Sequence, residues 1–301
     1  MSCSLNAILN EKSESALPLD CPLKDPVRQI RIWGSCAGLV CIGNERKVCI
    51  WNPSTGKYKG LPGFGSGFDL DSCLGFGYAE CIDDYKVLGF FFSRPWIKPE
   101  PEAKVYSLRS DSCRRLEVDT RVFHQGQGVH RASGTFVNGA LHWSEFEGSI
   151  ISFDIVKETF GEVLLPEVLL PEVLLADYRQ PCLPRGLAAS DGRLCLLCNE
   201  LFYTCFEVWV MKEYGVRDSW TKLVSMRGVR CPSPPLCLLE NCQVILDSYF
   251  IRYNIKDEKR SYPVIYNYPA RYAAYPYIES LVSPNFDANG GGFSGNNSTR
   301  V

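Results

Sequence analysis

Short apolar runs alternate with polar, turn-forming segments along most of the chain. The clearest series lies within residues 30–62, where strand-like runs occupy 30–33, 39–42, 48–51 and 57–62. Runs of β-branched and aromatic residues that are bounded by Gly, Pro and Asn are typical of short β-strands. The pentapeptide 52–56, Asn-Pro-Ser-Thr-Gly, contains residue types that each favour a tight turn. The series therefore predicts four short antiparallel strands.

The same four-run unit recurs four more times. Its further copies begin at Leu74, Gly134, Gly186 and Pro235. The third runs align on aromatic residues that stand 44 to 56 positions apart, which are Trp51, Tyr106, Phe153, Trp209 and Tyr253. A repeat of about 50 residues made of four short strands is the sequence signature of a β-propeller blade. We therefore predict an all-β, β-propeller-like domain of five to six four-stranded antiparallel blades.

This pattern divides the chain into three parts. Residues 1–27 contain no blade-like unit and are predicted to be an irregular N-terminal segment. The propeller is predicted over residues 28–284, and a sixth, irregular blade would come from residues 272–284 together with the N-terminus. Residues 285–301 are rich in Gly, Asn and Ser and are predicted to be a disordered tail.

One segment departs from the strand pattern. Residues 163–175 read VLLPEVLLPEVLL, a five-residue unit repeated two and a half times. Proline at every fifth position excludes a regular helix and a central strand. We interpret the segment as a tandem duplication that lengthens a loop between blades, because long surface insertions cost little closure entropy. A leucine-rich segment that docks a partner is the alternative.

Composition and charge narrow the range of partners. The chain has 301 residues, of which 46% are hydrophobic and 22% charged, and its formal net charge is -2. Because this charge is not positive, nucleic acid and anionic membranes are not expected as partners. No apolar stretch reaches the roughly 18 residues of a membrane span, and the first residues do not resemble a secretory signal. We expect a protein of the cytoplasm, the nucleus or both.

The residues that could carry chemistry have structural interpretations. Most of the 15 cysteines stand within apolar runs and are expected to be reduced thiols in the core. Cys195 and Cys198 form a C-x-x-C motif, but residues three apart in a strand point to opposite faces and cannot hold one metal ion. His142 is expected to be a half-buried sheet residue, and the adjacent Asp83 and Asp84 to be turn formers. We predict no metal site, no cofactor and no catalytic residue.

An enzyme is the main alternative of another class. A propeller can hold an active site in its central channel if titratable groups converge there from the first strands of the blades. The predicted first strands at 74–79, 134–138 and 186–190 carry few such groups. We therefore predict that the chain binds a protein and is not an enzyme.

Several segments together resemble one family of plant proteins. They are GSCAGLVCI and VCIWNPSTGKYKGLP within 34–62, LGFGYAECIDDYKVLGF at 74–90, GTFVNGALHWSE at 134–145 and YIESLVSP at 277–284. In this order they are similar to segments of the F-box-associated, kelch-type interaction domains of F-box/kelch-repeat proteins. The resemblance covers residues 31–284 and implies a kelch-like β-propeller.

The resemblance also implies a function in protein ubiquitination. In this family the propeller recognises a protein substrate, and an N-terminal F-box docks the Skp-type adaptor of a cullin (SCF) ubiquitin ligase. Residues 1–30 contain no recognisable F-box, so the adaptor and the cullin ligase are expected partners by resemblance only. The alternative is an orphan or truncated recognition domain that acts as a decoy and competes with full-length relatives for substrate.

Aromatic residues mark one side of the predicted propeller. In each blade, the loop from the second to the third strand and the link to the next blade open on the same side. These segments contain seven aromatic residues of interest, which are Phe64, Phe68, Trp96, Phe123, Phe146, Phe202 and Tyr203. Aromatic residues in loops are typical interface anchors, whereas the competing interpretation is that they fold back over the blade rims. We predict that this set binds the protein partner.

Overall fold

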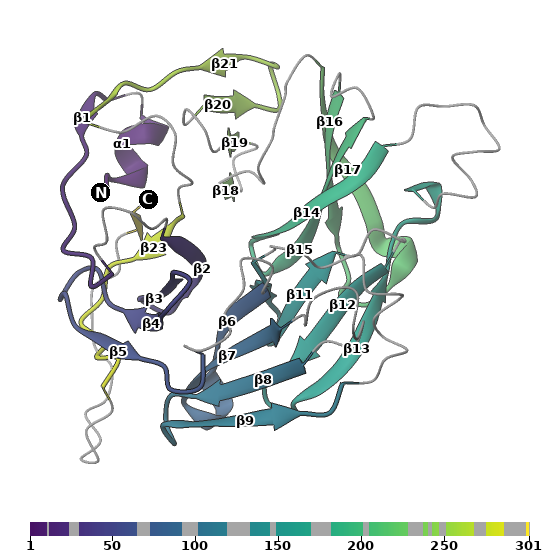
Figure 1. The fold of residues 1–301 in the computed structure, drawn as a ribbon. Helices are drawn as coiled ribbons and strands as arrows, with labels where there is room; N and C mark the ends of the chain where they lie inside the picture. Colours follow the sequence, from purple (N-terminus) through teal and green to yellow (C-terminus); the bar gives the residue numbers. More distant parts are fainter. Residues whose placement is uncertain are drawn as a thin grey trace.

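Five four-stranded antiparallel sheets succeed one another along the chain and are arranged around a common centre (Figure 1). The computed structural model describes residues 1–10, 12–23, 30–64, 73–91, 102–118, 133–144, 149–169, 182–200, 205–227, 237–239, 243–246, 251–267, 275–285 and 299–300. Within each sheet the strands pair in chain order. The prediction of a β-propeller with four-stranded antiparallel blades is confirmed, and five such blades lie in the described residues.

The strands follow the predicted repeats. The first sheet contains β2 (Arg31–Cys36), β3 (Leu39–Gly43), β4 (Val48–Trp51) and β5 (Tyr58–Gly60). The second contains β6 (Cys73–Ala79), β7 (Asp84–Phe91), β8 (Glu102–Ser107) and β9 (Ser112–Leu116). The third contains β10 (Thr135–Val137), β11 (Ala140–Ser144), β12 (Ser149–Asp154) and β13 (Thr159–Leu164).

The last two sheets repeat this order. The fourth contains β14 (Cys182–Ser190), β15 (Arg193–Glu200), β16 (Cys205–Met211) and β17 (Trp220–Arg227). The fifth contains β18 (Cys237–Leu239), β19 (Gln243–Leu246), β20 (Ile251–Asn254) and β21 (Arg260–Ser261). Short 3-10 helices occupy connections at η1 (Glu80–Ile82), η2 (Glu167–Leu169) and η3 (Arg217–Ser219).

The first strand of each sheet lies innermost, next to the first strand of its neighbour (Figure 1). β2 contacts β6, β6 contacts β10, and β14 contacts both β10 and β18. Between the second and third sheets, the amide of Gly134 donates a hydrogen bond to the carbonyl of Leu74 at 2.7 Å. A Cβ atom at Gly75 or Gly134 would lie only 2.7 or 2.5 Å from the Trp143 ring. Both glycines are therefore needed for the strands and the indole to approach so closely.

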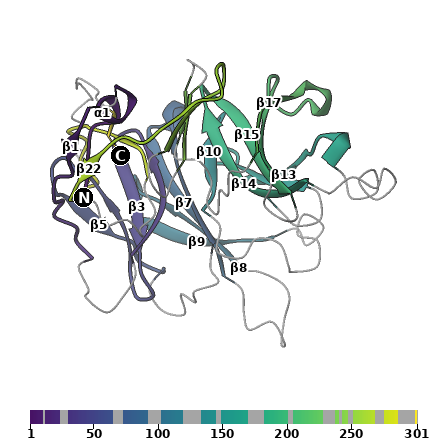
Figure 2. The same cartoon turned by 90° about the horizontal axis from the view of Figure 1, so that it is seen from above.

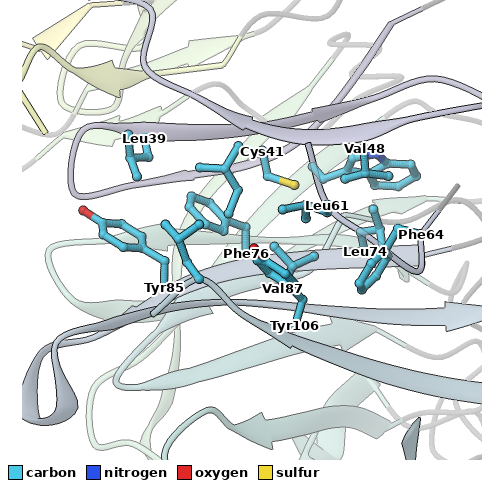
Figure 3. Close-up of a cluster of buried hydrophobic side chains, with 13 residues drawn as sticks. Leu39, Cys41, Val48, Leu61, Phe64, Leu74, Phe76, Tyr85, Val87 and Tyr106 are labelled. Atoms are coloured by element: carbon cyan, nitrogen blue, oxygen red, sulfur yellow. The ribbon is translucent and has the colours of Figure 1, made fainter. Parts of the chain in front are cut away.

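Apolar side chains from neighbouring sheets fill the space between them. In the cluster of Figure 3, Leu39 and Cys41 of the first sheet pack against Phe76 and Tyr85 of the second. The Phe76 and Tyr85 rings stack with their centroids 5.7 Å apart. The cores of the blades are therefore continuous from one sheet to the next, which holds the blades as one unit.

The C-x-x-C motif lies on β15, and both of its thiols are buried. Cys195 belongs to the apolar cluster that contains Phe206, whereas Cys198 belongs to the cluster that contains Trp220. The two sulfurs therefore lie on opposite faces of the sheet, as the alternation of side chains in a strand requires. Burial raises the pKa of Cys195 to about 12, so this thiol stays protonated and unreactive at neutral pH.

The N-terminal residues pair with a segment that follows the fifth sheet. They form α1 (Leu5–Leu9) and β1 (Glu14–Ser15), and β1 pairs in parallel with β22 (Ile265–Tyr266). Figure 2 shows β1 and β22 side by side next to the N-terminus. This differs from the irregular segment expected at residues 1–27, because elements this short are specified by distant pairing partners and not by a local pattern.

The C-terminal residues also make a two-stranded pair, in which β23 (Tyr277–Ile278) pairs with β24 (Thr299–Arg300). The expected disordered tail at 285–301 therefore contains a paired strand at its end. β23 also contacts β2 and β3 of the first sheet. On the side where a sixth blade was expected, the described residues form these two pairs and α1 (Figure 1).

Asn52 holds the C-terminal segment against the first sheet. This side chain is completely buried, and its Nδ2 donates hydrogen bonds to the carbonyls of Ser280 at 3.0 Å and Val282 at 2.7 Å. Its Oδ1 accepts hydrogen bonds from the amides of Ser54 at 2.8 Å and Thr55 at 3.2 Å. The turn predicted at 52–56 is therefore also the attachment point of the chain's other end.

Candidate functional site

The blades end on two opposite faces, because successive turns of an antiparallel meander alternate between its ends. We call the face that carries the turns between first and second and between third and fourth strands the turn face. It contains residues 37–38, 52–57, 80–83, 108–111, 138–139, 155–158, 191–192, 212–219 and 255–259. The loop face carries the loops between second and third strands and the links between sheets. Its described residues are 44–47, 61–64, 117–118, 133–134 and 165–169.

Most of the predicted binding residues lie outside the described residues. They are Phe68, Trp96, Phe123, Phe146, Phe202 and Tyr203. Phe64 is described, and its side chain is 1% exposed. The centroid of its ring lies 5.7 Å from that of Phe91. The ring also packs against Gly89, where a Cβ atom would lie only 2.8 Å from it. Phe64 is therefore a core residue, and its assignment to a binding surface is wrong because its ring packs in the cluster that contains Leu74 and Phe76 of the second sheet.

Two turns of the second sheet are fixed by the same interaction. The Tyr78 hydroxyl donates a hydrogen bond to Asp83 at 2.7 Å, and the Tyr106 hydroxyl donates one to Asp111 at 2.7 Å. Both aspartates have left-handed backbones, with φ of 48° and 47°, a conformation that Asp tolerates better than most residues. Burial and the acceptor Asp83 raise the pKa of Tyr78 to about 12. The Tyr78 hydroxyl therefore stays protonated at neutral pH and can donate to Asp83.

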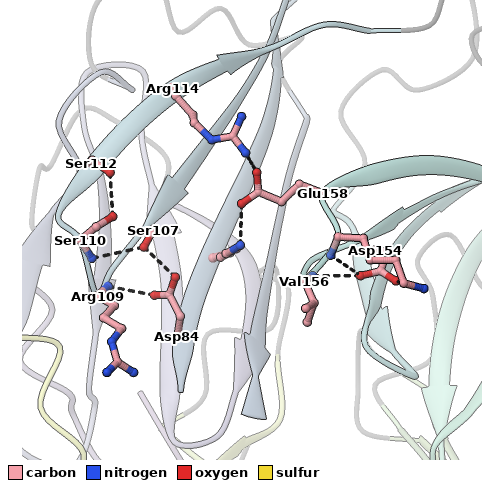
Figure 4. A network of polar contacts seen from close by, with 11 residues as sticks. Asp84, Ser107, Arg109, Ser110, Ser112, Arg114, Asp154, Val156 and Glu158 are labelled. Carbon is pink, nitrogen blue, oxygen red and sulfur yellow. Dashed lines mark hydrogen bonds and ion pairs between the residues drawn. The ribbon is translucent and has the colours of Figure 1, made fainter. Parts of the chain in front are cut away.

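Charged side chains join the second and third sheets on the turn face (Figure 4). Lys86 of β7 is 5% exposed, and its Nζ lies 2.5 Å from Oε1 of Glu158 in the turn after β12. Arg114 of β9 pairs with the other oxygen of Glu158. Burial lowers the pKa of Lys86. Each of these charges has a partner, so the group supports packing between blades and offers no free general base.

The adjacent carboxylates Asp83 and Asp84, both expected to be turn formers, have different partners. Asp84 is 4% exposed and accepts hydrogen bonds from the Ser107 hydroxyl at 2.6 Å and the Arg109 amide at 2.8 Å. Asp83 instead binds Tyr78. The two carboxylates accept these hydrogen bonds from different donors, and they act as turn-forming residues.

His142 is more deeply buried than the sequence indicated. It is completely inaccessible to solvent. Its Nδ1 lies 3.2 Å from the Thr135 carbonyl, and its Nε2 lies 2.7 Å from the hydroxyl of Tyr214 in the turn after β16. Burial lowers its pKa to about 4. The imidazole is therefore neutral at pH 7 and connects the third sheet to the fourth. No motif signals this contact, since the two residues are 72 positions apart.

Two kinds of feature are absent from the part of the chain that the structure describes. No group of three or more His, Cys, Asp or Glu side chains there is arranged to hold a metal ion. No helix in this part is long and apolar enough to cross a membrane.

A family model and two similar known proteins indicate the same family. The sequence model of the F-box associated beta propeller domain matches residues 1–280. The chain is 31% identical over 268 residues to the F-box/kelch-repeat protein At3g23880 of Arabidopsis thaliana, which covers 85% of this chain and 69% of that protein. It is 27% identical over 288 residues to the F-box protein CPR1 of Arabidopsis thaliana, which covers 83% of this chain and 67% of that protein.

Proposed function

Because the chain belongs to the family of F-box associated β-propeller domains, we propose that it recognises the protein substrate of a cullin-type ubiquitin ligase. The observation that carries this proposal is the family match over residues 1–280, together with relatives that are named as F-box proteins. A ligase of this type brings its substrate to the ubiquitin-carrying enzyme by binding it. The proposed role therefore requires a specific surface and no catalytic residue, cofactor or metal, and it places the protein in the cytoplasm, the nucleus or both.

We assign the substrate surface to the loop face. On the turn face, turns are fixed by hydrogen bonds such as those of Tyr78 and Tyr106. In the sequence, the connections from second to third strands contain Trp96, Phe146 and Tyr203, which we expect on the loop face. Binding residues occur preferentially on loops that a rigid scaffold positions, and large aromatic side chains supply most of the energy at many protein interfaces.

The substrate proposal is tested with a triple variant of the whole chain, Trp96→Ala, Phe146→Ala and Tyr203→Ala. Proteins that bind the tagged parent chain in plant extract are identified, and the most enriched one is purified and titrated against both chains. We expect the triple variant to lose at least about 30-fold in affinity, as for the loss of interface hot spots. An unchanged affinity, with unchanged circular dichroism, would overturn the assignment to the loop face.

Recruitment to the ligase needs a separate measurement, which is titration of the purified 301-residue chain with a plant Skp-type adaptor. Submicromolar binding would support a ligase role for the chain on its own. A folded chain that does not bind the adaptor, but does capture substrate, would instead act as a decoy that competes with F-box relatives.

A further inference from the structure

The repeated segment VLLPEVLLPEVLL begins inside β13, and the structure describes its first part. The segment spans residues 163–175, of which residues 163–169 are described. These seven residues read VLLPEVL, and the same heptapeptide recurs without change at residues 168–174. We call the two heptapeptides the first copy and the second copy. The third unit of the repeat ends at Leu175, so the segment contains two complete copies.

The first copy is held in an apolar site between the third and fourth sheets. Val163, Leu165 and Leu169 alternate with exposed residues and are buried in one apolar cluster. Five residues of the fourth sheet belong to the same cluster, and we call the site that they form the socket. They are Leu187, Leu194, Leu196, Met211 and Trp220.

Two hydrogen bonds from the fourth sheet and its turn add to this burial. Nε1 of Trp220 donates to the carbonyl of Leu164 at 2.9 Å. Nε of Arg217 donates to the carbonyl of Leu165 at 3.0 Å. Both acceptors belong to the backbone, so any residue at these two positions supplies them. The socket therefore selects its occupant through the buried side chains alone.

The second copy supplies every one of these groups. A shift of the chain by five residues brings Leu170 to the place of Leu165. Each other position of the heptapeptide likewise receives the residue type that it holds now. The contacts within the socket are therefore the same in the two registers, and only the flanking chain differs.

The flanking chain makes the first register the major one. In the second register, residues 163–167 would form a loop between Glu162 and Val168. Closing this loop costs free energy that the continuous strand avoids. β13 is the outermost strand of the third sheet, and among the described residues no strand pairs with its outer edge (Figure 1). A loop at this edge would therefore not interrupt the pairing of another strand.

We propose that the two copies compete for the socket, so that the chain exchanges between two registers five residues apart. The exchange changes the length of the link between the third and fourth sheets. Between the end of the docked copy and Cys182 of β14, the link has 12 residues in the first register and 7 in the second. The exchange goes beyond the proposed function and does not depend on it. Any partner that binds one link length better than the other would shift the population toward that register.

The first test places a carboxylate in the socket of the complete chain, through Leu165→Asp. In the second register the substituted residue leaves the socket, so the loss is limited to the cost of the loop. We expect the equilibrium constant for urea unfolding to rise by no more than about 30-fold. Leu194→Asp is the matched control, because Leu194 and Leu165 are each 1% exposed in the same cluster and Leu194 has no second copy. Its constant should rise at least about 1,000-fold, since a buried charge without a partner is strongly destabilising.

The second test blocks both registers by combining Leu165→Asp with Leu170→Asp. The combination leaves neither complete copy without a carboxylate. We expect the unfolding constant of this double variant to rise at least about 30-fold more than the product of the two single effects, because the two sites share one socket. Additive effects would mean that the second copy does not replace the first.

The third test reads the register directly through thiol labelling of the folded chain. Val168 is 53% exposed, and in the second register it takes the place of Val163, which is 4% exposed. A thiol introduced by Val168→Cys is therefore expected to react at least about tenfold more slowly when Leu165→Asp is also present. Peptide mass spectrometry separates this thiol from the 15 native cysteines.

Three results would overturn the proposal. They are a loss of stability in Leu165→Asp that equals the loss in Leu194→Asp, additive effects of Leu165→Asp and Leu170→Asp, and labelling of Val168→Cys that Leu165→Asp leaves unchanged. A Leu165→Asp chain that fails to fold counts as the first of these results.

Discussion

The contact between the second and third sheets and the contact between the first sheet and the C-terminal segment use different chemistry. The first, the charged contact, joins Lys86 and Arg114 to Glu158. The second, the neutral contact, joins the Asn52 amide to the carbonyls of Ser280 and Val282. Lys86 and Asn52 are both buried, at 5% and 0% exposed, whereas the Arg114 side chain is 57% exposed.

Whether a contact is charged or neutral determines how much stability is lost when one partner is removed. Removing a partner from the charged contact leaves a buried charge without compensation, whereas removing Asn52 leaves unpaired dipoles. The contact between His142 and Tyr214 is intermediate, because it is neutral at pH 7 but becomes charged in acid. The three contacts therefore form a series in which similar hydrogen bonds have different energies and different responses to pH.

Among the three contacts, we expect substitution in the charged contact to lower the free energy of unfolding the most. Glu158→Gln removes the ion-pair partner of buried Lys86 and leaves it beside Arg114, with only partial compensation from Asp84 and Asp154. We expect a loss of about 4 kcal/mol in the free energy of unfolding. Urea unfolding measures this loss. Glu162→Gln, which changes an exposed residue of β13, is the control and is expected to cost less than about 0.5 kcal/mol.

A second variant separates unpaired charge from lost packing. Adding Lys86→Met to Glu158→Gln removes the stranded charge and is expected to recover much of the stability. If the double variant is as unstable as Glu158→Gln, the unpaired charge is not the cause of the loss.

His142 is expected to make stability depend on pH. Its pKa is lowered from 6.5 to about 4 in the folded chain, so between these values the folded state binds fewer protons than the unfolded state. Stability therefore rises with pH across this window, and it is lost as pH falls from 6.5 toward 4. The expected loss is about 3 kcal/mol.

The measurement is urea unfolding of the parent chain and of His142→Gln at several pH values between 7 and 4. Other groups also titrate in this range, so the difference between the two chains isolates His142. The gap between the curves should narrow or reverse in acid. Curves that stay parallel would mean that protonation of this imidazole is not coupled to folding.

Removing the neutral contact is expected to cost less stability than removing the charged contact. Asn52→Ala removes the donor to the Ser280 and Val282 carbonyls, and we expect a loss of about 2 kcal/mol. Asn44→Ala is a close control, because Asn44 also accepts hydrogen bonds from the amides two and three positions later, at 3.0 and 3.1 Å. Equal losses in the two variants would show that Asn52 acts only through its own turn.

Local patterns along the sequence predicted the repeated parts of the molecule and not the contacts that join distant parts. The apolar runs located the five blades, because each strand is specified by its own alternation and its own turns. The pairing of β1 with β22 and the binding of Asn52 to Ser280, 228 positions away, leave no local trace. Phe64 was misassigned for the same reason, since its burial depends on the space above Gly89. The loop-face aromatics remain a prediction.

The smallest effect is expected at Tyr214, and it measures what the hydroxyl of this residue contributes to the contact with His142. The Thr135 carbonyl can only accept, so Nδ1 of the neutral imidazole donates to it and Nε2 accepts from the Tyr214 hydroxyl. Tyr214→Phe keeps the edge-to-face ring contact, at 5.6 Å and 81°, and removes only this donor. We expect a loss of about 1 kcal/mol at pH 7 in urea unfolding. Tyr58→Phe, at an exposed position, should cost nothing measurable, and an equal result for the two variants would mean that the hydroxyl contributes no net stability to the contact between the third and fourth sheets.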